Sequence, residues 1–78
     1  MKFTRISIDP TRMNGQPTIR DLRLTVKRVL ELVALYANRT ELFQEYPELE
    51  EADIQEALAY AISYFEDGIV EHSYEIVA

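Results

Sequence analysis

The sequence predicts a single, mainly α-helical domain in which three helices follow a short N-terminal β section. Three observations predict this class. The length of 78 residues corresponds to one domain. From Val26 onward, apolar residues recur at the three- and four-residue intervals of a helix. A four-residue turn, 47–50, separates the last two helices and gives them a helix-turn-helix outline. The predicted parts are a β and turn section (1–24), a three-helix core (25–67) and a C-terminal tail (68–78).

The N-terminal section begins with residues 3–8, which predict a short strand. Asp9-Pro10 ends it, because proline has no amide hydrogen for a strand ladder. The elements predicted next are a turn at Asn14-Gly15 with Pro17, a very short strand at Thr18–Arg20, a tight turn at Asp21-Leu22 and another very short strand at Arg23-Leu24.

The first two helices are predicted from an apolar stripe and from caps. The stripe of the first helix begins at Val26 and Thr25 is its N-cap. Its members are Val26, Val29, Leu30 and Val33, and Leu32 and Leu35 lie beside them. Asn38 and Glu41 form a capping box for a short second helix. Pro47 ends that helix at Tyr46, because the residue before a proline avoids the helical region.

The third helix is predicted over residues 50–66. One continuous apolar face consists of Ile54, Ala57, Leu58, Ala61, Ile62 and Phe65. Carboxylates crowd the first turn, where the helix dipole favours negative charge. Gly68 is the expected stop. The apolar segment 74–77 could form a strand with the N-terminal strand of the same or another subunit.

Charge is divided unevenly along the chain. Residues 1–28 have a net charge of +5 and residues 29–78 have −11, which together make the −6 of the whole chain. This division indicates two surfaces with different partners, or one surface that pairs with the other across a dimer. No stretch approaches the ~20 apolar residues of a membrane span, and the N-terminus lacks the apolar core of a signal peptide. We therefore expect a cytoplasmic protein without membrane contact.

Catalytic, metal and cofactor sites are not expected. The chain has no cysteine, and its one histidine, His72, has only adjacent Glu71 as a candidate partner. The acidic cluster Glu50, Glu51 and Asp53 is more typical of a helix start than of a metal site. Residues 14–30 lack the Gly-Lys-Ser/Thr ending of a nucleotide-binding loop.

Two binding surfaces are predicted. The second helix of a helix-turn-helix would read DNA, but here residues 50–66 carry five carboxylates and no basic residue, which phosphates repel. Protein binding is therefore favoured, with Tyr60, Tyr64 and Glu56 as contact residues. The basic section could still contact nucleic acid or a second subunit. Its candidate residues are Arg12, Arg20, Arg23, Lys27 and Arg28.

The sequence resembles the domain of unknown function 433 family, small proteins often described as antitoxins. The family pattern is present in order, as Ile8-Asp9-Pro10, Gly15 to Arg20, Arg23 to Val26, Tyr46-Pro47-Glu48-Leu49 and Asp53 to Leu58. Three family positions differ. Asp21-Leu22 replaces a Gly-Thr, Tyr36 replaces a glycine after the first helix, and Glu50 replaces a small hydroxyl cap. Gly15, Pro17, Asn38 and Pro47 are expected to have structural roles.

The resemblance implies a homeodomain-like three-helix core and pairing with a PIN-like nuclease toxin. Three hypotheses follow. The first is a non-enzymatic, homodimeric antitoxin-like protein whose acidic half covers the basic groove of the nuclease. The second is a DNA-binding autoregulator that uses the basic section. The third is a homodimer without a separate partner, in which the basic and acidic halves pair across the two-fold axis.

Overall fold

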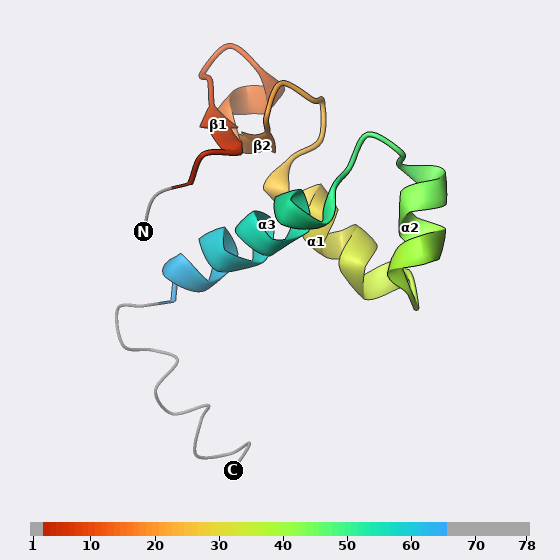
Figure 1. Ribbon diagram of the computed structural model, residues 1–78. Coiled ribbons are helices and arrows are strands. Elements are labelled where there is room, and N and C mark those ends of the chain that lie inside the picture. Colours follow the sequence, from red (N-terminus) through yellow and green to blue (C-terminus); the bar gives the residue numbers. More distant parts are fainter. Residues whose placement is uncertain (1–2, 66–78) are drawn as a thin grey trace.

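The computed structural model describes residues 3–65, which form three α-helices, a short 3-10 helix and a two-stranded antiparallel sheet (Figure 1). The elements are β1 (Ile6–Ile8), the 3-10 helix η1 (Met13–Gly15), β2 (Pro17–Ile19), α1 (Val26–Leu35), α2 (Arg39–Glu45) and α3 (Glu51–Ser63). Three predicted features lie outside the described residues, namely Gly68 as a helix stop, His72 and the possible strand at 74–77. Each helix within residues 3–65 is too short or too polar to cross a membrane.

The sheet pairs Ile6 with Ile19 and Ile8 with Pro17. The first predicted strand is thus confirmed, and it ends before Asp9-Pro10. The prediction of two further strands was half wrong, because Arg23-Leu24 forms no strand. One hydrogen bond from the Ile19 amide to the Leu24 carbonyl (2.9 Å) and a single bridge at Thr25 hold that segment instead.

The turn before β2 is tight and left-handed. Met13, Asn14 and Gly15 all have positive φ, and the Gly15 amide donates to the Arg12 carbonyl (2.7 Å). Positive φ is costly for most residues and tolerated by asparagine and glycine, which explains Asn14-Gly15. Pro17 follows as the first residue of β2, a position where a missing amide hydrogen is tolerated.

Helix α1 begins as predicted. The Thr25 hydroxyl accepts a hydrogen bond from the Arg28 amide (3.0 Å), as an N-cap should. Leu32, placed beside the apolar stripe by the pattern, is fully buried, whereas Leu35 is exposed. Tyr36 caps the end of α1 in an extended conformation (φ −89°), so the helix can end without a glycine there.

Helix α2 is bounded by the two predicted residues. The Asn38 side chain accepts from the Glu41 amide (2.9 Å) and thereby caps the N-terminus. The helix ends at Glu45, just before Tyr46 and Pro47. The Leu49 amide then donates to the Tyr46 carbonyl (3.0 Å), so residues 46–49 form a turn that contains the proline.

Helix α3 is shorter than predicted. It begins at Glu51 with Glu50 as N-cap, but it ends at Ser63 rather than at 66. The apolar pattern continues to Phe65, which shows that the pattern marks an apolar face and not the length of the helix. Ile62 and Phe65 are exposed at the end of that face.

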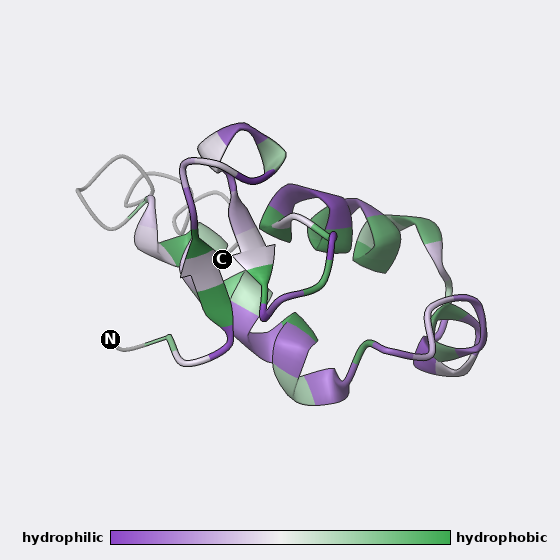
Figure 2. Cartoon of the chain, turned by 90° about the horizontal axis from the view of Figure 1, so that it is seen from above, coloured by the Kyte–Doolittle hydropathy of each residue, from purple (hydrophilic) through white to green (hydrophobic). Residues whose placement is uncertain are grey.

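Helices α1 and α3 cross near their N-terminal ends, and α2 lies beside the far end of α1 (Figure 1). The core consists of Ile19, Val26, Val29, Leu32, Leu42, Leu49, Ile54 and Ala57. Figure 2 shows hydrophobic colour reaching the end of α1. From this crossing the C-terminal end of α3 runs away from the C-terminal end of α1 (Figure 1).

Candidate functional site: a buried arginine–aspartate cluster and an apolar groove

The most buried charged group described is the carboxylate of Asp53, whose residue has no solvent exposure. Arg20 donates to it twice, from Nε at 3.1 Å and from an Nη at 2.6 Å. Arg5 donates from another Nη at 3.0 Å, and the Glu50 amide adds a fourth hydrogen bond at 2.9 Å. Each carboxylate oxygen of Asp53 thus accepts two hydrogen bonds. A buried charge requires partners of this kind, because it has lost its hydration by water.

The protonation of Asp53 follows from two opposed effects. Burial by itself raises its pKa, but the hydrogen bonds from Arg20, from the Glu50 amide and from Arg5 outweigh burial. The net result is a pKa below the ordinary value of an aspartate. Asp53 is therefore ionised at neutral pH and joins the β section to the start of α3.

The backbone of Arg20 is shaped for this contact. Its φ of 48° is left-handed, and its amide donates to the Arg5 carbonyl (2.6 Å). An Nη of Arg20 also donates to the Glu48 carbonyl (2.7 Å) in the turn before α3. A glycine in this turn would allow a positive φ, but the positive φ falls on Arg20 and not on Asp21. The replacement of the family's Gly-Thr by Asp21-Leu22 is thus compatible with this turn.

Glu56 forms its hydrogen bonds within the chain. Its carboxylate accepts from the Arg5 amide (2.9 Å), the Thr4 amide (3.4 Å) and the Thr4 hydroxyl (3.1 Å). The hydrogen bond from the Arg5 amide is the main cause of a lowered pKa of Glu56. Glu56, predicted as a partner contact, here holds the start of the N-terminal segment against α3.

Of the five predicted basic residues, three form contacts within the described chain and two remain exposed without an ion pair. Arg20 donates to the buried carboxylate of Asp53, and Arg12 donates to the carbonyls of Asp21 (3.0 Å) and Leu22 (3.3 Å). Arg28 pairs with Glu31 (3.2 Å). Arg23 and Lys27 are exposed and form no ion pair within residues 3–65.

The carboxylates at the start of α3, Glu50, Glu51 and Asp53, form ion pairs with arginines. Arg5 pairs with Glu50 (2.7 Å) as well as with Asp53, and Arg39 pairs with Glu51 (2.9 Å). The basic and acidic halves of the sequence therefore meet within one chain at this cluster. The acidity of α3 that the sequence shows is largely neutralised by the protein's own arginines.

A groove opens in the angle between α1 and α3, with a volume of about 200 Å³. We call it the α1–α3 groove. Its walls are Val26, Lys27 and Leu30 from α1, Tyr60, Ala61 and Tyr64 from the end of α3, and Gln16 and Pro17. Among the described residues, Lys27 is its one charged wall residue.

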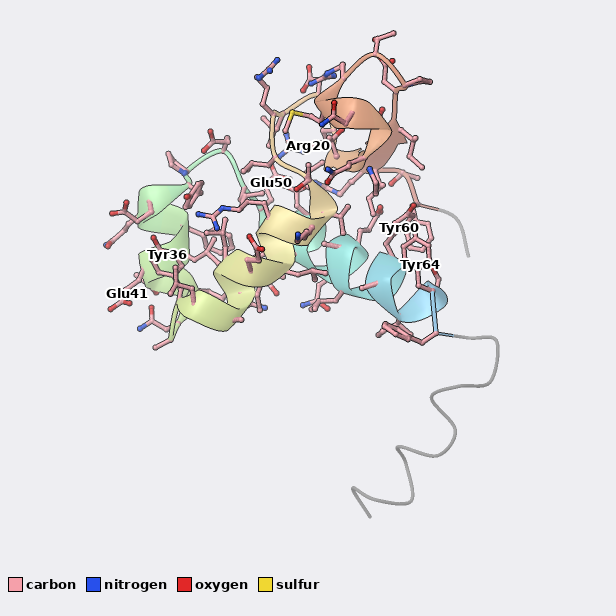
Figure 3. All side chains as sticks on the ribbon, turned by 180° about the vertical axis from the view of Figure 1, so that it is seen from behind. Arg20, Tyr36, Glu41, Glu50, Tyr60 and Tyr64 are labelled. Atoms are coloured by element: carbon pink, nitrogen blue, oxygen red, sulfur yellow. The ribbon has the colours of Figure 1, made fainter. Side chains whose placement is uncertain are left out.

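The two predicted tyrosines form part of this groove. The Tyr60 ring packs edge-on against Tyr64 (centroids 5.3 Å apart) and against Phe3 (5.3 Å), and the tyrosine hydroxyls are 3.3 Å apart. This hydroxyl contact, with some burial, raises the pKa of Tyr60. Figure 3 shows the tyrosines at one end of the molecule and Glu41 and Tyr36 at the other. The structure thus brings Tyr60 and Tyr64 together and leaves Glu56 in a different set of contacts.

The end of α3 has no charge at all. Residues 57–65, which we call the uncharged segment, read ALAYAISYF. Three of its side chains are largely exposed, with fractions of 62% for Ile62, 68% for Tyr64 and 54% for Phe65. Contiguous exposed apolar side chains of this kind are typical of binding surfaces.

Sequence reasoning missed Arg5 and the role of Asp53. Asp53 stands at the third position of α3, three residues after Glu50, and such spacing suggests a capping box. The approach of Arg5 has no sequence signal, because it comes from 48 residues away. Within residues 3–65, no three His, Cys, Asp or Glu residues are grouped so that they could hold a metal ion.

Comparison with known proteins places the chain in a family. A family model described as "Protein of unknown function (DUF433)" matches residues 6–61, from β1 almost to the end of α3. Comparisons with curated proteins and with solved structures gave no match. The matched range includes Arg20, Asp53 and most of the α1–α3 groove. The chain therefore belongs to the DUF433 family, as its sequence resemblance predicted.

Proposed function

We propose that this chain is a non-enzymatic, antitoxin-like protein that binds a PIN-like nuclease and neutralises it by direct contact. The observation that carries the proposal is an acidic face on α2 and the following turn, formed by Glu41, Glu45 and Glu48. All three are exposed, and none forms an ion pair within the described part of the chain. By contrast, Glu50, Glu51 and Asp53 at the start of α3 form ion pairs with arginines.

The charge of this face suits a basic partner. The family resemblance implies a PIN-like nuclease, a class that tends to have a basic substrate groove. Exposed carboxylates attract such a groove and speed the encounter. The attraction is screened by salt, so the proposed binding weakens as ionic strength rises.

The test uses the nuclease encoded in the neighbouring reading frame, with calorimetry and inhibition of RNA cleavage as readouts. The variant Glu41→Gln/Glu45→Gln/Glu48→Gln should bind the nuclease at least about tenfold more weakly. Glu31→Gln is the matched control, because Glu31 is exposed but paired with Arg28. Unchanged affinity of the triple variant would overturn the proposed surface, and an unaffected nuclease would overturn the function.

The same assay tests the surface predicted from the sequence. If Tyr60→Ala/Tyr64→Ala abolishes nuclease binding while the triple glutamine variant retains it, the nuclease contact lies at the end of α3. Circular dichroism shows whether each variant is folded.

We also propose that the chain acts as a homodimer with a homeodomain-like helical core. A domain of 78 residues has a small core, and dimerisation adds buried surface. Exposed apolar side chains in the uncharged segment support the dimer. The salt bridges of the described residues join basic and acidic halves in one chain, which leaves less charge for pairing across a dimer.

DNA binding is the second candidate function, and Arg23 and Lys27 favour it. Both are exposed near the start of α1, where the first turn holds no acidic residue. Gel shifts with the upstream promoter test the candidate, since phosphate contacts make binding fall steeply with salt. Arg23→Gln/Lys27→Gln should remove any shift, and a wild-type protein that gives no shift at low salt would reject DNA binding.

A further inference from the structure

The α1–α3 groove has the size and chemistry of a site for one aromatic side chain. Its volume is about 200 Å³. A protein cavity of roughly 150 Å³ with apolar walls holds a benzene molecule. Val26, Leu30 and Ala61 supply apolar walls, and Tyr60 and Tyr64 supply aromatic ones. An aromatic ring that enters this groove would bury apolar surface on both sides.

The uncharged segment supplies such a ring next to the groove. Phe65 is 54% exposed and stands one residue after Tyr64, which is itself a groove wall. The segment therefore contributes both a wall and a candidate insert. An interface between identical chains related by a two-fold axis requires this combination, since the same patch on each copy must be self-complementary.

Charge distinguishes a second copy from other occupants. The chain has a net charge of −6, so two copies repel each other over most of their surface. Residues 57–65 carry no charge and so add nothing to that repulsion, although Glu66 and Asp67 follow them directly in the sequence. Among the described residues, the groove walls offer nucleic acid one cation, Lys27, and offer a basic nuclease no carboxylate. The uncharged segment of a second copy is therefore the occupant that best matches the groove walls.

We infer that a second copy of this chain occupies the α1–α3 groove, with the ends of α3 packed about a two-fold axis and Phe65 of each copy in the groove of the other. This assignment rests on the proposed homodimer and specifies its interface. It leaves Glu41 of the acidic face exposed, because Glu41 lies at the other end of the molecule from Tyr60 and Tyr64 (Figure 3).

The oligomeric state of the full chain tests the assignment by sedimentation and light scattering. Wild type is expected to be a dimer that persists between about 0.05 and about 1 M salt, because an uncharged interface is not weakened by screening. Phe65→Glu should raise the dimer dissociation constant at least about tenfold, since each interface then buries two carboxylates. Leu35→Glu is the matched control, because Leu35 is 69% exposed but lies at the far end of α1.

Disulfide trapping is the second measurement, and the absence of native cysteine makes it specific. A mixture of Phe65→Cys and Leu30→Cys chains should form mixed disulfides under mild oxidation. A mixture of Phe65→Cys and Leu35→Cys should not.

The outcomes separate the two proposals. If wild type is a dimer that Phe65→Glu leaves intact, or that high salt dissociates, the groove assignment is overturned and the homodimer stands. If wild type is a monomer, both are overturned, whether residues 66–78 or another protein fill the groove. The proposed binding to a nuclease is tested by a separate assay, and neither oligomeric state of the wild type would overturn it.

Discussion

The buried carboxylate of Asp53 makes a quantitative prediction about stability. Asp53→Asn keeps the shape of the side chain but removes the charge that Arg5 and Arg20 surround. Breaking a buried ion pair costs about 3–5 kcal/mol. The two arginine side chains are 32% and 33% exposed, so water can hydrate them once the charge is gone. We therefore expect a loss of about 2–3 kcal/mol in the free energy of unfolding.

This loss should depend on pH in a definite direction. The folded state lowers the pKa of Asp53, so its contribution to stability is fully present above the pKa of the unfolded state, about 3.9. The contribution is lost as the pH falls through the folded pKa, because the carboxylate is then protonated in both states. The stabilities of wild type and Asp53→Asn should differ at neutral pH and converge in acid.

Urea denaturation followed by circular dichroism, at pH 7 and at several values below pH 4, measures both effects. A domain of this size should also lose about 10–20 °C in Tm at neutral pH. Asp21→Asn is the control, because Asp21 is exposed and the charge removed is the same. Equal stability of wild type and Asp53→Asn at pH 7, or a constant difference down to the lowest pH, would refute the reasoning.

Three further predictions concern the helices and the N-terminal segment. Asn38→Ala should destabilise the fold by about 1 kcal/mol in urea titrations, because the Glu41 amide loses its cap, and Asn38→Ser should recover most of the loss. Leu32→Ala should cost about 3 kcal/mol, since the side chain is 1% exposed; an effect below about 1 kcal/mol would mean that Leu32 is not in the core. Glu56→Gln should lower the urea midpoint at pH 7, and the difference from wild type should shrink in acid, where the lowered pKa of Glu56 is passed.

Local signals in the sequence predicted the helix starts and ends best. Thr25 and Asn38 cap α1 and α2 through hydrogen bonds to residues three positions on, so the cause and its effect lie within one turn. Pro47 acts on its immediate neighbour in the same way. Such features depend on a few adjacent residues and can be predicted from a sequence.

Features set by tertiary contact could not be predicted in this way. Arg20 reaches Asp53 across 33 residues, and the turn places the positive φ on Arg20 rather than on the residue that replaces the family's glycine. Leu32 lies beside the periodic stripe but is buried in one cluster with Leu42 of α2. The groove likewise depends on how α1 and α3 cross. Tyr60 and Tyr64 could be singled out by composition, but not as its wall.

The contacts of Asp53 also affect how the molecule opens. One carboxylate joins residue 5, residue 20 and the start of α3, so the β section cannot separate from α3 without breaking several of its bonds at once. Amide hydrogens of Arg5, Arg20 and Asp53 should consequently exchange with deuterium through one shared opening event. The three segments then behave as a single cooperative unit, although they are far apart in the chain.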